Sequence, residues 1–355
     1  MVQPGLVVLL SSGEAAASGR RVYEWLFRRL PVPPHVAVME TPAGFQPNSA
    51  LVAEKVAGFI RHHLSNHEPQ VVVVPARKRG TPFGTDNPDI VASVRNADAI
   101  LLGPGSPTYA VRQLQDSLAW QTIQARHRLG AALILASAAT IAAGELALPV
   151  YEIYKVGEDL HWSPGLNLFG AFGLRLVLIS HWDNTEGGAD LDTSRGFLGR
   201  SRFSELRGML PPQIRVVGLD EHTALIIDIQ AKICHVMGRG GVCLCFEGLE
   251  RRFEHGQSFP TSELGTVRSP DLQEGIPTAV WQLAQRQHGS EQSGIATQPA
   301  PAVIALVQER EAARTHRDWA AADALRRRIA SFGWFVRDTP AGPALSQQAE
   351  RSEPE

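Results

Sequence analysis

The sequence predicts an α/β fold: a mostly parallel, doubly wound sheet with helices on both of its faces. Short apolar runs recur along the first half of the chain, and stretches of helical length separate them. These runs lack alternation between polar and apolar residues, which is typical of parallel strands buried on both faces. The helix-length segments between them supply the crossover connections that parallel strands require.

In the first half of the chain the elements follow one another in strand–helix order. We expect strands at residues 6–10, 36–39, 71–74, 99–102 and 133–136. A helix over residues 14–29 places Val22, Leu26 and Leu30 on one face. A second helix follows Asn48, a residue type that caps helices well.

After residue 174 the links between apolar runs become short. We expect strands at residues 176–179, 216–219, 224–227, 233–237 and 242–246. The turns at residues 220–222 and 238–241 are too short for a crossover helix, so they favour antiparallel hairpins at the edge of the sheet. One α/β domain is therefore predicted over residues 1–287.

The chain changes character near its C-terminus. Residues 288–301 contain several Gly, Ser and Pro residues and predict a flexible linker. Two amphipathic helices follow, and Gly333 stands where it would end the second of them. We predict a small helical hairpin unit over residues 302–345, with a short strand at residues 334–336, and a disordered polar tail over residues 346–355.

The composition argues against several protein classes. The chain has 355 residues, of which 44% are hydrophobic and 20% charged, and its formal net charge of −2 indicates neither a nucleic-acid nor a membrane partner. No apolar run approaches the roughly 20 residues of a transmembrane helix, and the N-terminus does not resemble a signal peptide. We expect a cytoplasmic protein in which the three cysteines, an odd number, are buried thiols. We expect neither a bound metal nor a cofactor. The oligomeric state stays open between a monomer and a homo-oligomer.

Ser137 follows the apolar run at residues 133–136 and precedes small residues and a helical stretch. This order is typical of a nucleophile elbow, a sharp strand-to-helix turn that presents a hydroxyl at the edge of a sheet. The usual elbow has glycine two residues before and two residues after the serine, where this chain has Leu135 and Ala139. The alternative is a serine that only caps the following helix.

Two further loops follow strands at the edge where open α/β sheets bind ligands. The loop at residues 103–109 begins Gly-Pro-Gly, and Gly105 can turn a backbone amide toward a substrate oxygen. His181 follows the strand at residues 176–179 in a polar loop, which suits a general base. The alternative is a surface histidine, or one that pairs with carbonyls of its own loop.

Residues 1–250 resemble the serine-peptidase family of dipeptidase E and cyanophycinase. The resemblance rests on the glycine loop at residues 103–109, on Ser137-Ala138 after a strand, and on His181 further along. Three more segments match in order and spacing: residues 199–203, 218–224 and 236–240. The resemblance implies a class I glutamine amidotransferase-like fold with flavodoxin-like layering.

The same resemblance implies a catalytic triad and an acyl-enzyme, because the family uses a serine nucleophile, a histidine base and a carboxylate. It assigns the first two roles to Ser137 and His181. It assigns the carboxylate to Glu152, which stands at about the family's offset from the serine, with Glu145 and Asp159 as alternatives.

The resemblance also implies how a small peptide or amide substrate is held. The backbone amides of Ala138 and Gly105 would hold the oxyanion. The family prefers aspartyl peptides or the aspartate–arginine polymer cyanophycin, so a guanidinium near the site would pair with a substrate carboxylate. Four arginines are candidates: Arg112, Arg195, Arg200 and Arg202. We expect Arg202 and Asn184 to bind substrate, while the acidic residues beside His181 favour a basic substrate instead.

Residues 302–345 resemble the C-terminal tail domain of cysteinyl-tRNA synthetases. The resemblance rests on Glu309-Arg310, Ala313-Arg314, Asp318-Trp319-Ala320, Ala322-Asp323, Leu325-Arg326, Phe332-Gly333 and residues 338–343. In the synthetases this region lies at the anticodon end of tRNA, so it implies a tRNA contact through residues 302–345, with the basic run at residues 326–328 facing phosphate. The alternatives are a solvated helix face or a hairpin that binds protein. No segment resembles the ATP-binding motifs or zinc-binding cysteines of the synthetases, so aminoacylation is not expected.

Two functions follow. The first is a serine-type hydrolase that cleaves a peptide or isopeptide amide bond through a Ser-His-carboxylate triad. The second is an amidotransferase-like binding protein of impaired activity, whose C-terminal hairpin contacts tRNA or a protein partner. The pair Ser137 and His181 favours the hydrolase, whereas Leu135 and Ala139 at the elbow favour the binding protein.

Overall fold

The computed structural model describes residues 3–292, 301–316, 318–339 and 342–347. The chain divides into two compact units, residues 1–288 and residues 289–355. Within the described part of the chain, every helix is too short or too polar to span a lipid bilayer.

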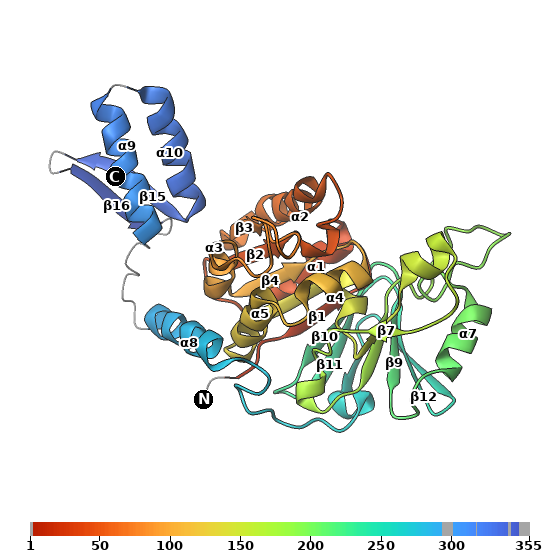
Figure 1. Cartoon of the computed structure of the whole chain (residues 1–355). Helices are drawn as coiled ribbons and strands as arrows, with labels where there is room; N and C mark the ends of the chain where they lie inside the picture. The colour runs from red at the N-terminus through yellow and green to blue at the C-terminus, as the bar shows by residue number, and fades with distance from the viewer. Residues whose placement is uncertain (1–2, 293–300, 317, 340–341, 348–355) are drawn as a thin grey trace. The chain divides into compact units, whose positions relative to one another are not determined.

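The larger sheet of the first unit confirms the predicted α/β class (Figure 1). It has eight strands in the order β14-β11-β10-β1-β5-β4-β2-β3. Their bounds are β1 Val7–Leu10, β2 His35–Met39, β3 Gln70–Val74, β4 Ala99–Leu102, β5 Ala132–Ala136, β10 Thr223–Asp228, β11 Ile233–Gly238 and β14 Ser258–Pro260. Strands β1 to β5 pair in parallel, whereas β10, β11 and β14 extend the sheet with antiparallel pairs.

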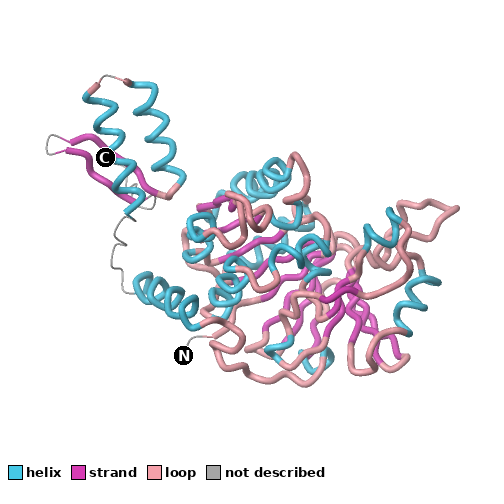
Figure 2. The backbone as a smooth tube through the Cα atoms, viewed as in Figure 1, coloured by secondary structure: helices cyan, strands magenta, loops and turns pink. Residues whose placement is uncertain are grey.

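A second sheet, which the sequence did not predict, has six strands in the order β13-β12-β9-β8-β6-β7 (Figure 2). Their bounds are β6 Leu146–Ala147, β7 Ser163–Pro164, β8 Leu176–Ile179, β9 Arg215–Leu219, β12 Gly241–Phe246 and β13 Leu249–Glu254. The prediction that residues 220–222 and 238–241 close hairpins is wrong. Both turns pass from one sheet to the other, because β9 and β12 pair with each other while β10 and β11 pair in the larger sheet.

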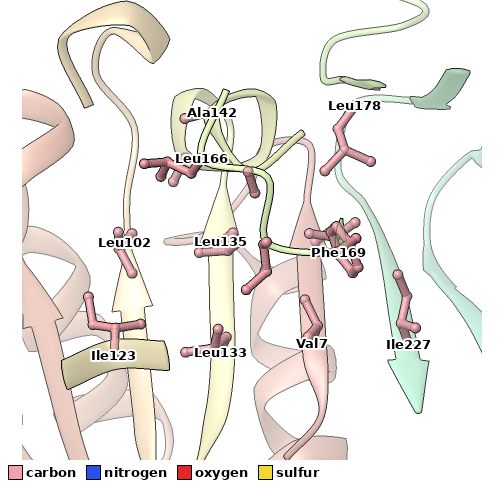
Figure 3. Packing of buried hydrophobic residues seen from close by; sticks show 14 of the residues in the cluster. Val7, Leu102, Ile123, Leu133, Leu135, Ala142, Leu166, Phe169, Leu178 and Ile227 are labelled. Atoms are coloured by element: carbon pink, nitrogen blue, oxygen red, sulfur yellow. The ribbon is translucent and has the colours of Figure 1, made fainter. Parts of the chain in front are cut away.

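Helices cover both faces of the larger sheet and the outer face of the second sheet. Their bounds are α1 Ala17–Phe27, α2 Ser49–His63, α3 Pro88–Val91, α4 Pro107–Leu114, α5 Leu118–Arg128, α6 Ala138–Ala142 and α7 Arg200–Gly208. Helices α1 and α2 pack on one face, where Val8 and Ile134 point. Helices α4, α5 and α6 pack on the other face, and the second sheet contributes Leu178 and Val217 to the same core (Figure 3). Helix α7 lies over the outer face of the second sheet.

Helix α8 (Thr278–Gln292) continues past the point where the sequence predicted a linker to begin. Residues 288–292 are helical, and residues 293–300 of the predicted linker lie outside the described residues. Helix α8 packs through Trp281 and Ala284 against Ala125 and Leu129 at the end of α5.

The second unit contains the predicted helical hairpin together with a β-hairpin. Helices α9 (Pro301–Thr315) and α10 (Trp319–Ser331) are followed by the antiparallel strands β15 (Trp334–Thr339) and β16 (Gly342–Gln347). Gly333 joins α10 to β15 with a positive φ of 78°, which glycine adopts without steric strain. The predicted disordered tail begins too early, because β16 includes residues 346 and 347, and residues 348–355 lie outside the described residues.

Candidate active site

Ser137 forms a sharp turn between β5 and α6. Its backbone has φ 53° and ψ −107°, a conformation that is strained for any residue with a Cβ. Its hydroxyl makes no hydrogen bond with the first turn of α6, so Ser137 does not act as an ordinary helix cap. Strain of this kind is typical of a serine held in an elbow.

Leu135 and Ala139, which replace the usual elbow glycines, are both buried in the core between the sheets and helices. The side chain of Leu135 is in the cluster that also contains Leu133 and Leu102 (Figure 3). Because alternate residues of a strand point to opposite faces, Leu135 and Leu133 share this face while Ile134 points to the other. A bulky residue before the turn is therefore accommodated in the core.

Buried hydroxyls hold the turn in place. The Thr140 hydroxyl donates to the carbonyl oxygens of Leu10 at 2.9 Å and of Leu135 at 2.8 Å. The Ser180 hydroxyl donates to the Ser137 carbonyl at 3.2 Å. Ser137 itself donates its amide to the Leu10 carbonyl at 2.9 Å. The ends of β1 and β5 and the residue after β8 are thereby fixed around the serine.

His181 lies directly beside Ser137. The distance from Ser137 Oγ to His181 Nε2 is 2.9 Å, although the strands that precede the two residues, β5 and β8, belong to different sheets. The His181 amide donates to Ser11 Oγ at 2.7 Å, and the Ser11 hydroxyl donates to the Leu219 carbonyl at 3.0 Å. Ser11 is fully buried, so it fixes the His181 backbone between the ends of β1 and β9.

The carboxylate on His181 belongs to Glu221, and the prediction of Glu152 requires correction. His181 Nδ1 lies 3.0 Å from Glu221 Oε1. Glu152 instead accepts a hydrogen bond of 2.5 Å from the Thr108 hydroxyl, since it lies on a π-helical turn, η4 (Glu152–Val156), that faces α4. The alternative Glu145 pairs with Arg175. The other alternative, Asp159, is exposed.

The surroundings of Glu221 keep its carboxylate ionised. The hydrogen bond with His181 is the main cause that lowers its pKa to about 2, and a hydrogen bond from Asn184 adds to this effect. Asn184 is buried, and its Nδ2 donates to Glu221 Oε1 at 2.8 Å. An ionised carboxylate only accepts, so Nδ1 of His181 carries the hydrogen of this contact, and in that tautomer of the imidazole Nε2 is the atom that can accept from Ser137.

The turn that carries Glu221 is anchored by its neighbour Asp220, which is buried. The Asp220 carboxylate accepts the Gly241 amide at 2.8 Å and forms an ion pair with Arg252 of β13. The sequence predicted a turn in this segment and a match to the family, but it assigned no catalytic carboxylate there. The signal that could have found Glu221 was its position just after a strand, but Asp220 shares that position.

A pocket of about 280 Å³ opens over Ser137 and His181. Its lining includes Gly105 and Ala138, the two residues predicted to supply oxyanion donors. The Ala138 amide is the first N–H of α6, which has no acceptor within the helix. Only glycine fits at position 105, because a Cβ there would lie 1.8 Å from the Pro42 carbonyl oxygen.

The residues predicted to bind substrate do not line this pocket. Arg202 donates through Nε to the Leu198 carbonyl at 2.8 Å. Asn184 donates to the Glu221 carboxylate. It therefore positions that side chain and does not line the pocket. Lys155, which the sequence analysis missed, lines the pocket together with Glu186.

In the described part of the chain, no group of three or more His, Cys, Asp or Glu side chains is arranged to hold a metal ion. Cys234, Cys243 and Cys245 are free and buried, as predicted.

Two comparisons find similarity in the C-terminal part of the chain. Residues 299–342 match the family model of the cysteinyl-tRNA ligase anticodon binding domain. The chain is 46% identical over 48 residues to the cysteine–tRNA ligase of Methanosarcina mazei, covering 14% of this chain and 10% of that protein. It is 51% identical over 45 residues to the ligase of Chlamydia abortus, covering 13% of this chain and 10% of that protein. The chain thus spans about a tenth of the length of these curated relatives.

A solved structure resembles the rest of the chain. It is a peptidase from an acI-B1 Actinobacterium, with a TM-score of 0.58 and 20% sequence identity, covering 72% of this chain and 97% of that one. The chain therefore combines a fold shared with a known peptidase and a C-terminal segment that matches the anticodon binding domain of cysteinyl-tRNA ligases.

Proposed function

We propose that the first unit is a serine-type hydrolase that cleaves a peptide or isopeptide amide bond through Ser137, His181 and Glu221. The observation that carries the proposal is the 2.9 Å contact between Ser137 Oγ and His181 Nε2 at a serine with a strained backbone. A hydroxyl that only packed in the structure would need neither the strain nor the histidine. The shared fold with a peptidase is consistent with the proposal.

In the acylation step, His181 Nε2 takes the proton of Ser137 while Oγ attacks the substrate carbonyl carbon. The negative charge that develops on the carbonyl oxygen is held by the backbone amides of Ala138 and Gly105. His181 then gives its proton to the leaving nitrogen, the C–N bond breaks, and an ester remains on Ser137. Glu221 accepts from Nδ1 throughout and stabilises the imidazolium.

In the deacylation step, His181 removes a proton from water, and the resulting hydroxide attacks the ester carbonyl. The same amides hold the second oxyanion. Collapse of this intermediate breaks the C–O bond to Ser137, and His181 returns the proton to the serine oxygen. The products are a carboxylic acid and an amine.

A fluorophosphonate probe tests this proposal, because it reacts with an activated serine. We expect the purified full chain to be labelled at Ser137, as read by mass spectrometry, and we expect no labelling in Ser137→Ala or His181→Ala. Absence of labelling in a folded wild-type sample would overturn the proposal.

A second function, contact with tRNA through the C-terminal unit, is favoured by the match of residues 299–342 to an anticodon binding domain. Three exposed arginines, residues 326–328, lie together on α10. Trp319 at the start of this helix is 58% exposed, and the Arg314 guanidinium lies 5.9 Å from its ring centre. Exposed cations and an exposed aromatic ring on the same helix suit an RNA backbone and an unstacked base.

Fluorescence anisotropy of a labelled tRNA transcript with the full chain tests this second function. Arg326→Gln with Arg327→Gln should weaken binding and lower the salt dependence of log K by about one for each lost phosphate contact. The matched control is Arg200→Gln with Arg239→Gln, two exposed arginines of the first unit. Equal effects of the two double variants would contradict a specific RNA contact by α10.

A further inference from the structure

We propose that the catalytic pocket selects an apolar or aromatic acyl group rather than an acidic one. This proposal rests on the proposed hydrolase function and names its substrate class. It departs from the preference for aspartyl groups that the family resemblance implies.

The charge of the pocket argues against an acidic side chain. Besides His181, the lining contains one basic side chain, Lys155, and one acidic side chain, Glu186, and both are exposed. Their charges are opposite and both are in solvent, so neither offers a substrate carboxylate a buried counter-charge. Among the described residues, no arginine lines the pocket. Arg195 is stacked on Trp182, at 3.9 Å from the ring centre, and donates to its carbonyl.

Several of the other side chains that line the pocket are apolar or aromatic. Ile141 and Val150 contribute aliphatic surface, and both are buried. Tyr151, Tyr154 and Phe197 contribute rings, and the ring centres of Tyr154 and Phe197 lie 5.8 Å apart. Such a surface gains free energy by excluding water around an apolar group.

Phe197 is a wall residue that lies beside the histidine. Its ring centre lies 5.2 Å from that of His181. Its backbone φ is 70°, an unfavourable value for a bulky side chain. Backbone hydrogen bonds impose this conformation: the Phe197 amide donates to Thr193 at 3.1 Å, and the Gly196 amide donates to His181 at 3.1 Å. The strain is maintained at a position where it places an aromatic ring beside both the histidine and the pocket.

Diphenyl phosphonate esters that differ only in side chain test the proposal. Each reacts when the serine oxygen attacks phosphorus and one phenolate leaves, so the rate reports how well the side chain fits. The set consists of N-acetyl 1-aminoalkyl phosphonates with the side chains of Phe, Leu and Asp. We expect the Phe compound to inactivate the full chain at least about tenfold faster than the Asp compound, at matched ionic strength.

A neutral alkyl fluorophosphonate, measured in parallel, separates the two proposals. Labelling of Ser137 by this probe together with equal rates for the Phe and Asp compounds, or a faster Asp compound, would overturn the specificity proposal and leave the hydrolase standing. Failure of the alkyl probe to label Ser137 would overturn the hydrolase and, with it, the specificity.

Variants at Phe197 test the role of its ring. Phe197→Gly removes the ring and suits the positive φ, so the backbone at this position gains no strain. We expect the ratio of Phe to Asp rates to fall about fivefold in Phe197→Gly and to fall less in Phe197→Leu, which keeps an apolar wall. An unchanged ratio in Phe197→Gly would show that the ring does not select the acyl group.

Discussion

The two units of this chain show their similarity to known proteins in opposite ways. In the first unit the likeness lies in the fold, at 20% identity to a solved peptidase. Its candidate site joins Ser137, His181 and Glu221, which lie far apart in the sequence. In the second unit the likeness lies in the sequence, at 46% identity over 48 residues, and the unit is built from neighbouring elements.

The contrast follows from how each unit is stabilised. The second unit has a small core that includes Val303, Leu306 and Ile329, together with a buried Arg310 that pairs with Asp338. These residues all lie between positions 303 and 338, so the pattern that builds the unit is contained in one short stretch. In the first unit many sequences can fill the large core, while the site depends on a few residues at strand ends.

The largest effect is expected from a comparison of two glutamates. Glu221→Gln should lower the rate of labelling and of hydrolysis by about 10³- to 10⁴-fold, because the amide no longer holds His181 in the tautomer that accepts from Ser137. Glu152→Gln is the matched control, since Glu152 pairs with Thr108. Kinetics of both variants with a chromogenic ester decide between the two carboxylates. A large loss in Glu152→Gln and none in Glu221→Gln would refute the assignment.

A large loss of stability is expected from Leu135→Ala, confined to the first unit. Leu135 is 1% exposed in the core, so truncation should lower the free energy of unfolding by about 3 kcal/mol. Urea denaturation followed by circular dichroism measures this loss. If stability is unchanged, Leu135 does not pack as the structure shows.

A smaller loss is expected in the second unit from Asp338→Asn. The Arg310 side chain is 3% exposed, and its guanidinium pairs with Asp338 at 2.9 Å. Loss of the carboxylate should destabilise this unit by about 2 kcal/mol, less than for a fully buried pair because Asp338 is 44% exposed. Thermal unfolding should show the loss there, with Ser137 labelling retained. Glu309→Gln, at an exposed position of α9, is the control and should leave stability unchanged.

The smallest expected effect is on the stability of the protein at acidic pH. The pKa of Glu221 is lowered from 4.5 to about 2 in the folded chain, so its stabilising contribution is complete above pH 4.5 and is lost as the pH falls toward 2. We expect Glu221 to contribute about 1 kcal/mol to the free energy of unfolding. This is less than the pKa shift alone would give, because its side chain is 31% exposed and solvent screens its interactions. Urea unfolding at pH 5 and pH 3 should show a smaller pH dependence in Glu221→Gln than in the wild type. The same dependence in both would contradict the hydrogen bond between His181 and Glu221.

Patterns of local origin predicted much of the fold. The five parallel strands were visible as apolar runs, and the first two helices and the C-terminal helices were visible as periodic apolar residues. The division of the strands into two sheets was not, because an apolar run does not specify which strand it pairs with. The turn at residues 220–222 was therefore taken for a hairpin, although it passes between the sheets.

The sequence alone determined that Ser137 and His181 each follow a strand, but the two strands belong to different sheets, so no shared sheet edge accounts for their contact. Only the tertiary structure decided that their hydroxyl and ring lie 2.9 Å apart, and that Glu221 supplies the carboxylate. An offset along the chain favoured Glu152, but a π-helical turn directs Glu152 to Thr108. The physical reason is that a hydrogen bond depends on positions in space, and for Glu221 those positions are set by a turn linking two separately paired sheets.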